Sequence, residues 1–250
     1  MQFSVCIDAV FRGWSQEEAL EALKAAGYGS FEFWGWWDRD LDSLQAKART
    51  LGLSCHALCT RMVSLTDPAQ RASYLAGLVE SIDAAKRLGA KILISQVGND
   101  TGAVRSFQHK SVVAGLKAAA PLLEESGITL AIEPLNGRVD HTGVYLESSD
   151  EGFDIVREVG SGRVKLLFDI YHQQISEGDL ISRIGSNLDS IAHFHAAGAP
   201  GRHELDQGEL NYPAIFKFLD DRGYGGLIGL EYFPSQDITE GLKKLRGLKA

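Results

Sequence analysis

Short runs of apolar and β-branched residues alternate along the chain with longer stretches in which apolar residues recur at helical spacing. The short runs predict strands at residues 2–7, 30–34, 53–59, 91–96, 128–133, 164–169, 190–195 and 227–231. The longer stretches predict helices at residues 16–26, 41–51, 68–88, 106–126, 149–159, 179–184, 212–222 and 239–248. Strands and helices that alternate in this way are typical of a parallel sheet.

Local signals mark where several of these helices begin and end. Gly27, Gly52 and Gly127 each follow a helical stretch, where a left-handed residue commonly closes the last turn. Asp67 precedes Pro68, an N-cap and first-turn combination that favours a helix start. Eight strand–helix units in 250 residues predict one α/β domain over residues 1–250, a single (β/α)8 TIM barrel.

A doubly wound open sheet is the alternative architecture for the same alternation. That fold commonly carries a glycine-rich fingerprint directly after its first strand. The segment from Ile7 to Gly13 contains no such fingerprint. The pattern therefore favours the closed barrel.

Four strands in the second half of the chain each end in a side chain that can bind a divalent metal ion. These side chains are Glu133, Asp169, His195 and Glu231. Because parallel strands in a barrel all point the same way, we expect the four to converge on its C-terminal face. Three carboxylates and an imidazole suit Mg²⁺ or Mn²⁺ better than a structural zinc site, with Co²⁺ or Zn²⁺ as further options. The sequence predicts one divalent metal ion.

Side-chain alternation in the seventh strand separates its two histidines from the residue between them. His193 and His195 share one face and Phe194 has the other, so both histidines are expected to face the barrel axis. His195 is nearer the mouth and is the expected ligand, whereas His193 is expected one layer deeper, held by hydrogen bonds. Asp169 has a competing interpretation as an N-cap, although His172 adds a second polar group at the same rim.

The second strand leads into a cluster of aromatic residues. Glu32 and Trp34 share a face and are expected to line the substrate mouth, although packing in the core is the alternative for the aromatic residues. Trp34, Trp36 and Trp37 together also suit a subunit interface, which is compatible with a homo-oligomer. Arg202 lies in a glycine-containing loop after His195, where a mobile lid residue that contacts substrate is expected.

Two cysteines flank a histidine in the third predicted strand and resemble a metal motif. Simple alternation places Cys55, Ala57 and Cys59 on one face and His56 on the other. We therefore interpret the cysteines as buried structural residues. The chain contains three cysteines and no export signal, which indicates reduced thiols and a cytoplasmic location.

The charge balance and the hydrophobic runs limit the partners. A formal net charge of −8 disfavours nucleic acid, whose binding depends on clustered Lys and Arg. No apolar run approaches the roughly 20 residues that a membrane span needs. The expected partner is a small carbonyl compound or sugar.

Several segments resemble the hydroxypyruvate isomerase family, within the xylose isomerase-like group of barrels that includes ketose 3-epimerases. The segments are residues 132–136, 168–179, 201–212 and 229–232. The resemblance implies that Glu133, Asp169 and Glu231 bind the metal and that Glu133 and Glu231 also transfer protons. It implies further that His172 and Arg202 contact substrate oxygens. This chain has His195 where the hydroxypyruvate isomerases have Gln, as in the ketose 3-epimerases, so the substrate stays open between the two.

The chemistry of such a site can be argued from the residue types. Moving a carbonyl by one carbon requires removal of a proton beside it, and a divalent ion stabilises the resulting enediolate. Glu133 and Glu231 would act as base and acid. We therefore predict a metal-dependent isomerase that converts hydroxypyruvate to tartronate semialdehyde, as the resemblance implies, with a ketose 3-epimerase as the alternative.

Other classes explain the pattern less well. A glycoside hydrolase also uses two glutamates, but it has no need for Asp169 and His195 between them. A DNA-repair nuclease on a related barrel would favour a basic face and more than the seven histidines present. A non-catalytic sugar- or metal-binding barrel would not require the pair of glutamates.

Overall fold

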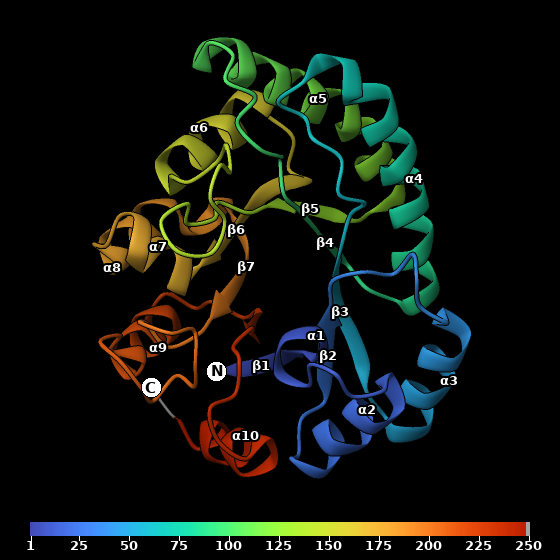
Figure 1. Ribbon diagram of the computed structural model, residues 1–250, viewed down its shortest axis with the longest axis vertical. Coiled ribbons are helices and arrows are strands. Elements are labelled where there is room, and N and C mark those ends of the chain that lie inside the picture. Colours follow the sequence, from blue (N-terminus) through green and yellow to red (C-terminus); the bar gives the residue numbers. More distant parts are fainter. Residues whose placement is uncertain (249–250) are drawn as a thin grey trace.

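Eight parallel strands close into a barrel in the computed structural model, which describes residues 1–248 (Figure 1). The strands are β1 (Gln2–Cys6), β2 (Ser30–Phe33), β3 (Ser54–Cys59), β4 (Ile92–Ser95), β5 (Thr129–Ile132), β6 (Val164–Asp169), β7 (Ile191–Ala196) and β8 (Leu227–Leu230). Each strand pairs with its neighbour in sequence, and β1 pairs with β8. The closure confirms the predicted (β/α)8 barrel and contradicts the open sheet.

Helices surround the strands on the outside of the barrel (Figure 1). The α-helices are α1 (Ile7–Val10), α2 (Gln16–Ala25), α3 (Leu41–Leu51), α4 (Arg71–Leu88), α5 (Arg105–Ser126), α6 (Ser149–Val159), α7 (Ile170–Ser176), α8 (Leu180–Asn187), α9 (Tyr212–Asp221) and α10 (Ile238–Arg246). Two 3₁₀ helices are η1 (Pro68–Gln70) and η2 (Leu188–Ser190). The sequence pattern missed α1 and α7, which begin directly after β1 and β6. Within residues 1–248, no helix is long and apolar enough to cross a membrane.

The expected helix signals form in the structure. The side chain of Asp67 accepts a hydrogen bond from the backbone N–H of Ala69, so it caps the 3₁₀ turn that precedes α4. Gly52 and Gly127 follow α3 and α5 with φ of 64° and 72°, a left-handed conformation that glycine adopts without a Cβ penalty. These signals fix the points at which the chain turns back toward the barrel.

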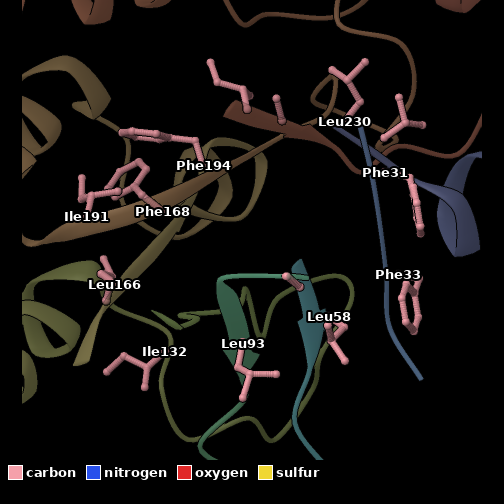
Figure 2. Close-up of a cluster of buried hydrophobic side chains, with 14 of the residues drawn as sticks. Phe31, Phe33, Leu58, Leu93, Ile132, Leu166, Phe168, Ile191, Phe194 and Leu230 are labelled. Atoms are coloured by element: carbon pink, nitrogen blue, oxygen red, sulfur yellow. The ribbon is translucent and has the colours of Figure 1, made fainter. Parts of the chain in front are cut away.

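The main hydrophobic core lies between the outer face of the strands and the helices, as Figure 2 shows. Phe168 of β6 and Phe194 of β7 are fully buried there, with ring centroids 6.1 Å apart. A smaller apolar cluster fills the barrel interior, and its buried members are Ala57, Cys59, Ile92, Ile94, Ala131 and Leu167. Phe194 therefore points outward, as the alternation in β7 predicts, which turns the flanking histidines inward.

A bulge in the third strand contradicts the predicted faces of its cysteines. Phe31 pairs with Cys55, but Glu32 pairs with Ala57, so His56 is an extra residue in β3. The bulge breaks the alternation: Cys55 joins the outer core and Cys59 the inner cluster. His56 turns toward the interior, with its ring 4.8 Å from that of His193. All three cysteines are buried and free, as expected for structural residues.

Candidate active site

The four predicted metal ligands converge at the C-terminal mouth of the barrel. Glu133 and Glu231 directly follow β5 and β8, Asp169 ends β6, and His195 is the penultimate residue of β7. One ligand atom from each lies within 4.8 Å of the others, and all four residues are buried. The parallel barrel therefore gathers side chains that are up to 98 positions apart in the sequence.

The donor atoms fit a bound cation. Nδ1 of His195 lies 3.5 Å from Oε1 of Glu133 and 3.3 Å from Oε2 of Glu231. Nδ1 of His195 and Oε1 of Glu133 are buried, and neither has a hydrogen-bond partner within residues 1–248. Unpaired polar atoms of this kind cost free energy, which a divalent ion at the same point would offset. The residues present are thus able to hold a metal ion through three carboxylates and one imidazole.

Asp169 is both an N-cap and a candidate ligand, because its two oxygens face different ways. Oδ1 accepts hydrogen bonds from the backbone N–H groups of Tyr171 and His172, at 2.8 and 3.1 Å, and so caps α7. Oδ2 lies 3.6 Å from Nε2 of His172, beyond hydrogen-bonding distance. The cap leaves Oδ2 free to bind a cation, so the two interpretations of this residue are compatible.

Glu133 and Glu231 differ in their electrostatic surroundings. Burial raises the pKa of Glu133 to about 7, although His195 opposes the rise. Burial also opposes ionisation of Glu231, but the charges of His195 and Arg202 outweigh it and lower the pKa of that carboxyl. Arg202 pairs directly with Glu231, and Trp34 donates a hydrogen bond to it through Nε1 at 2.6 Å. Two carboxyls whose pKa values are pushed apart suit acid and base roles.

Glu32 lies below the mouth, which corrects the expectation that it lines the substrate entrance. Its Oε2 accepts a 2.6 Å hydrogen bond from Ser4 and shares a 3.0 Å bond with Nε2 of His193. Its Oε1 is 2.9 Å from Nε2 of His195. The reason is that Glu32 precedes Trp34 by two positions, which places it one layer deeper on the same face. His193 occupies this deeper layer, as expected.

A cavity of about 360 Å³ opens beside the four ligands. It is lined by Trp34, Met62, Gln96, Glu133, Leu135, Asp140, His141, Arg202, Glu231 and Phe233. His172 is not among these residues; it is fully buried next to His141, with ring centroids 5.2 Å apart, and its Nε2 lies on the side of Asp169. The sequence pattern did not identify Asp140 and His141, whose only signal is polar residues in the loop after the fifth strand.

Arg202 is held in place, in contrast to the mobile lid residue expected from its loop. It is 7% exposed, and its guanidinium lies 5.4 Å from the ring centroids of both Tyr171 and Phe233. Its carbonyl accepts a 2.8 Å hydrogen bond from the N–H of Phe233. The buried Glu204 accepts further hydrogen bonds from Ser235, which tie the loop after β7 to the loop after β8. Arg202 is therefore a fixed positive charge at the mouth.

Comparison with known proteins agrees with this architecture. The profile of the xylose isomerase-like TIM-barrel family matches residues 20–248. The chain belongs to this family. This family membership confirms the group to which the sequence motifs pointed.

Three known proteins show how similarity to the family is distributed. A 2-oxo-tetronate isomerase of Cupriavidus necator is 44% identical over 131 residues, which are 52% of this chain and 50% of that protein. The hydroxypyruvate isomerase of Escherichia coli is 28% identical over 97% of both chains. A crystal structure titled AP endonuclease, family 2, from Brucella melitensis superposes with a TM-score of 0.94 at 26% identity, covering 100% of this chain and 99% of that one. The aligned segment spans about half the length of the Cupriavidus protein.

Proposed function

We propose that this protein is a divalent-metal-dependent isomerase that moves the carbonyl group of a short 2-oxo acid, with hydroxypyruvate as the leading substrate. The observation that carries the proposal is the buried convergence of Glu133, Asp169, His195 and Glu231 within 4.8 Å of one another. The 2-oxo-tetronate and hydroxypyruvate isomerases among its relatives support the same class of reaction.

The two glutamates would carry the proton transfers. A bound divalent ion would polarise the carbonyl group and stabilise the enediolate charge that develops when the neighbouring carbon loses its proton. Burial raises the pKa of Glu133 to about 7 in the absence of a metal, and a bound cation would favour its carboxylate form, which can accept the proton. Arg202 lowers the pKa of Glu231, and a bound cation would take the place of the positive charge of His195, so Glu231 would act as the second carboxylate.

The dimensions of the cavity favour a small substrate, to which Arg202 offers a positive charge. At about 360 Å³ it lies near the lower end of the roughly 300–1,000 Å³ range of ligand pockets. Arg202 contributes a buried guanidinium, a group whose geometry matches a carboxylate. Trp34 and Phe233 add apolar walls that limit access of water.

Deuterium incorporation from solvent tests this proposal directly. Purified protein would be incubated in deuterated water with Mn²⁺ or Mg²⁺ and with hydroxypyruvate, other short 2-oxo acids or free ketoses, and followed by NMR. We expect deuterium at the carbon beside the carbonyl group of hydroxypyruvate, abolished by a chelator and restored by the ion. Absence of exchange with every metal-loaded 2-oxo acid would overturn the assignment.

A ketose 3-epimerase is the second candidate, favoured by His195 at the seventh-strand position. An epimerase would place deuterium at carbon 3 of a ketose and yield the epimer in the same incubation. The variant His195→Gln tests whether this residue influences the choice of substrate: if it only tunes the metal, the ion preference should change and the order of substrates should stay as in the parent.

A further inference from the structure

Asn136, in the loop after β5, is fully buried beside the candidate active site, and its amide orientation is fixed by the backbone. Oδ1 accepts hydrogen bonds from the N–H groups of Val139 and Asp140, at 3.0 and 3.2 Å. Backbone N–H groups only donate, so the atom that faces them must be the oxygen. The amide nitrogen therefore points the other way.

The amide nitrogen of Asn136 has two acceptors to satisfy. Nδ2 donates a 2.7 Å hydrogen bond to Oδ2 of Asp140 and lies 2.6 Å from Nδ1 of His172. An amide NH₂ group has two donors and no acceptor, so Nδ1 of His172 must receive the second hydrogen. A neutral imidazole that accepts at Nδ1 carries its proton on Nε2. The hydrogen bonds alone thus select one tautomer of His172.

The selected proton faces the candidate metal ligands. Nε2 of His172 is buried and has no hydrogen-bond partner within residues 1–248, and Oδ2 of Asp169 is 3.6 Å away. A buried N–H without a partner costs free energy that an incoming oxygen atom would offset. We propose that Asn136 is a positioning residue that holds His172 as the Nε2–H tautomer, so that this N–H donates to a substrate oxygen that binds among the candidate metal ligands beside Asp169, which, like His172, is not among the residues that line the cavity. The donor role rests on the proposed function, whereas the choice of tautomer does not.

A purely structural role for Asn136 is the competing explanation, since its Oδ1 also shapes the loop up to Asp140. Asn136→Asp keeps that oxygen in place and replaces the donor that faces His172 and Asp140 by an acceptor. The new carboxylate would repel Asp140. The matched variant is therefore a double variant that combines Asn136→Asp with Asp140→Asn. That double variant preserves the net charge and a donor–acceptor pair between the two positions, and it removes the donor toward His172.

The tautomer is read by ¹⁵N NMR of histidine-labelled, metal-free protein at neutral pH, with the His172 signals assigned by their loss in His172→Gln. We expect the parent protein to carry the proton on Nε2 and the double variant to carry one on Nδ1, where the new carboxylate accepts it. Asn187→Asp, the same change at the end of α8, should leave the signals of His172 as in the parent. A parent with the proton on Nδ1, or a double variant with a proton on Nε2 only, would overturn the assignment.

Exchange kinetics test the donor role separately. The double variant should lower the rate of deuterium exchange into substrate about 10–100-fold, the effect of one lost hydrogen bond to a charged oxygen. Metal affinity, measured by equilibrium dialysis, should be unchanged, and Asn187→Asp should exchange at the parent rate. A moved proton with an unchanged exchange rate would refute donation to substrate.

If the double variant does not fold, Asn136→Ala should give a mixture of tautomers, and retention of pure Nε2–H would refute the role of Asn136. If the parent catalyses no exchange, the proposed function and the donation to substrate fail together, and the NMR result still decides whether Asn136 fixes the tautomer.

Discussion

The indole Nε1 of Trp34 donates a 2.6 Å hydrogen bond to Oε1 of Glu231 and so joins the end of β2 to the end of β8 across the barrel mouth. The backbone N–H of Trp34 donates to the carboxylate of Asp8 at 2.8 Å, which fixes the residue from the other side. A hydrogen bond to a carboxylate favours its charged form. Trp34 therefore helps to keep Glu231 ionised.

Replacing the indole by a phenyl ring should separate this hydrogen bond from simple packing. Trp34→Phe keeps an aromatic wall and removes a bond to a charged group worth about 1.5–3 kcal/mol, so kcat should fall about 10–100-fold. Trp36→Phe is the control, because its Nε1 donates to Ser81 at 3.3 Å, away from the candidate ligands. If Trp34→Phe and Trp36→Phe have the same kcat, Trp34 contributes only apolar surface to the cavity.

The two glutamates should respond unequally to loss of their charge. Glu133→Gln and Glu231→Gln each retain one oxygen for the metal and remove the basic carboxylate, so each should lower turnover about 10²–10⁴-fold. If one glutamate performs both proton transfers, only its variant should lose deuterium exchange, whereas the other should exchange without turnover. If excess Mn²⁺ restores the turnover of both variants to near the parent rate, the glutamates only bind the metal.

Glu32 should control metal affinity through His195. Oε1 of Glu32 and Nε2 of His195 lie 2.9 Å apart, and neither atom bonds to another group in the described part of the chain. A carboxylate behind a metal-binding histidine typically contributes 10–100-fold to metal affinity. Glu32→Gln should weaken Mn²⁺ binding in equilibrium dialysis by about that factor, whereas Glu151→Gln, at the start of α6, should not. Parent-like affinity would contradict the role of Glu32.

The ion pair around His109 should make stability depend on pH. Burial disfavours the charged imidazole, but hydrogen bonds to Glu158 and Glu151 outweigh it and raise the pKa of His109 above its ordinary value. A raised pKa means that the stabilisation is complete below the unfolded value of about 6.5 and is lost as pH rises through the folded value. His109→Gln should therefore lower Tm at pH 5.5 but not at pH 9. A surface pair of about 0.5 kcal/mol corresponds to a shift of about 1–2 °C by calorimetry.

The barrel and its four strand-end side chains could be predicted because both follow from periodicity. Apolar runs locate the strands, and the last polar residue of a parallel strand must lie at the C-terminal mouth. This reasoning places Glu133, Asp169, His195 and Glu231 correctly at one end of the barrel. The positions of these four side chains follow from the strands alone and do not depend on the conformation of the loops.

The remaining parts depend on features that periodicity does not encode. The bulge at His56 shifts the register by one residue and reverses the face of Cys55, and no composition signal marks it. Helix α7 begins within the strand-end segment because Asp169 caps it, so a strand pattern hides the helix. The contacts of Asn136 come from a loop whose path is set by backbone hydrogen bonds to its own side chain.

The division of the active site between the two halves of the barrel affects how such a protein can change during evolution. All four candidate metal ligands come from β5 to β8 and the positions that follow them, whereas Trp34, Met62 and Gln96 reach the same cavity from the first half of the chain. Substitutions at Met62 or Gln96 can therefore reshape the space for substrate without disturbing an ion. New substrate ranges could arise by drift in the N-terminal loops while the reaction chemistry is inherited unchanged from the C-terminal half.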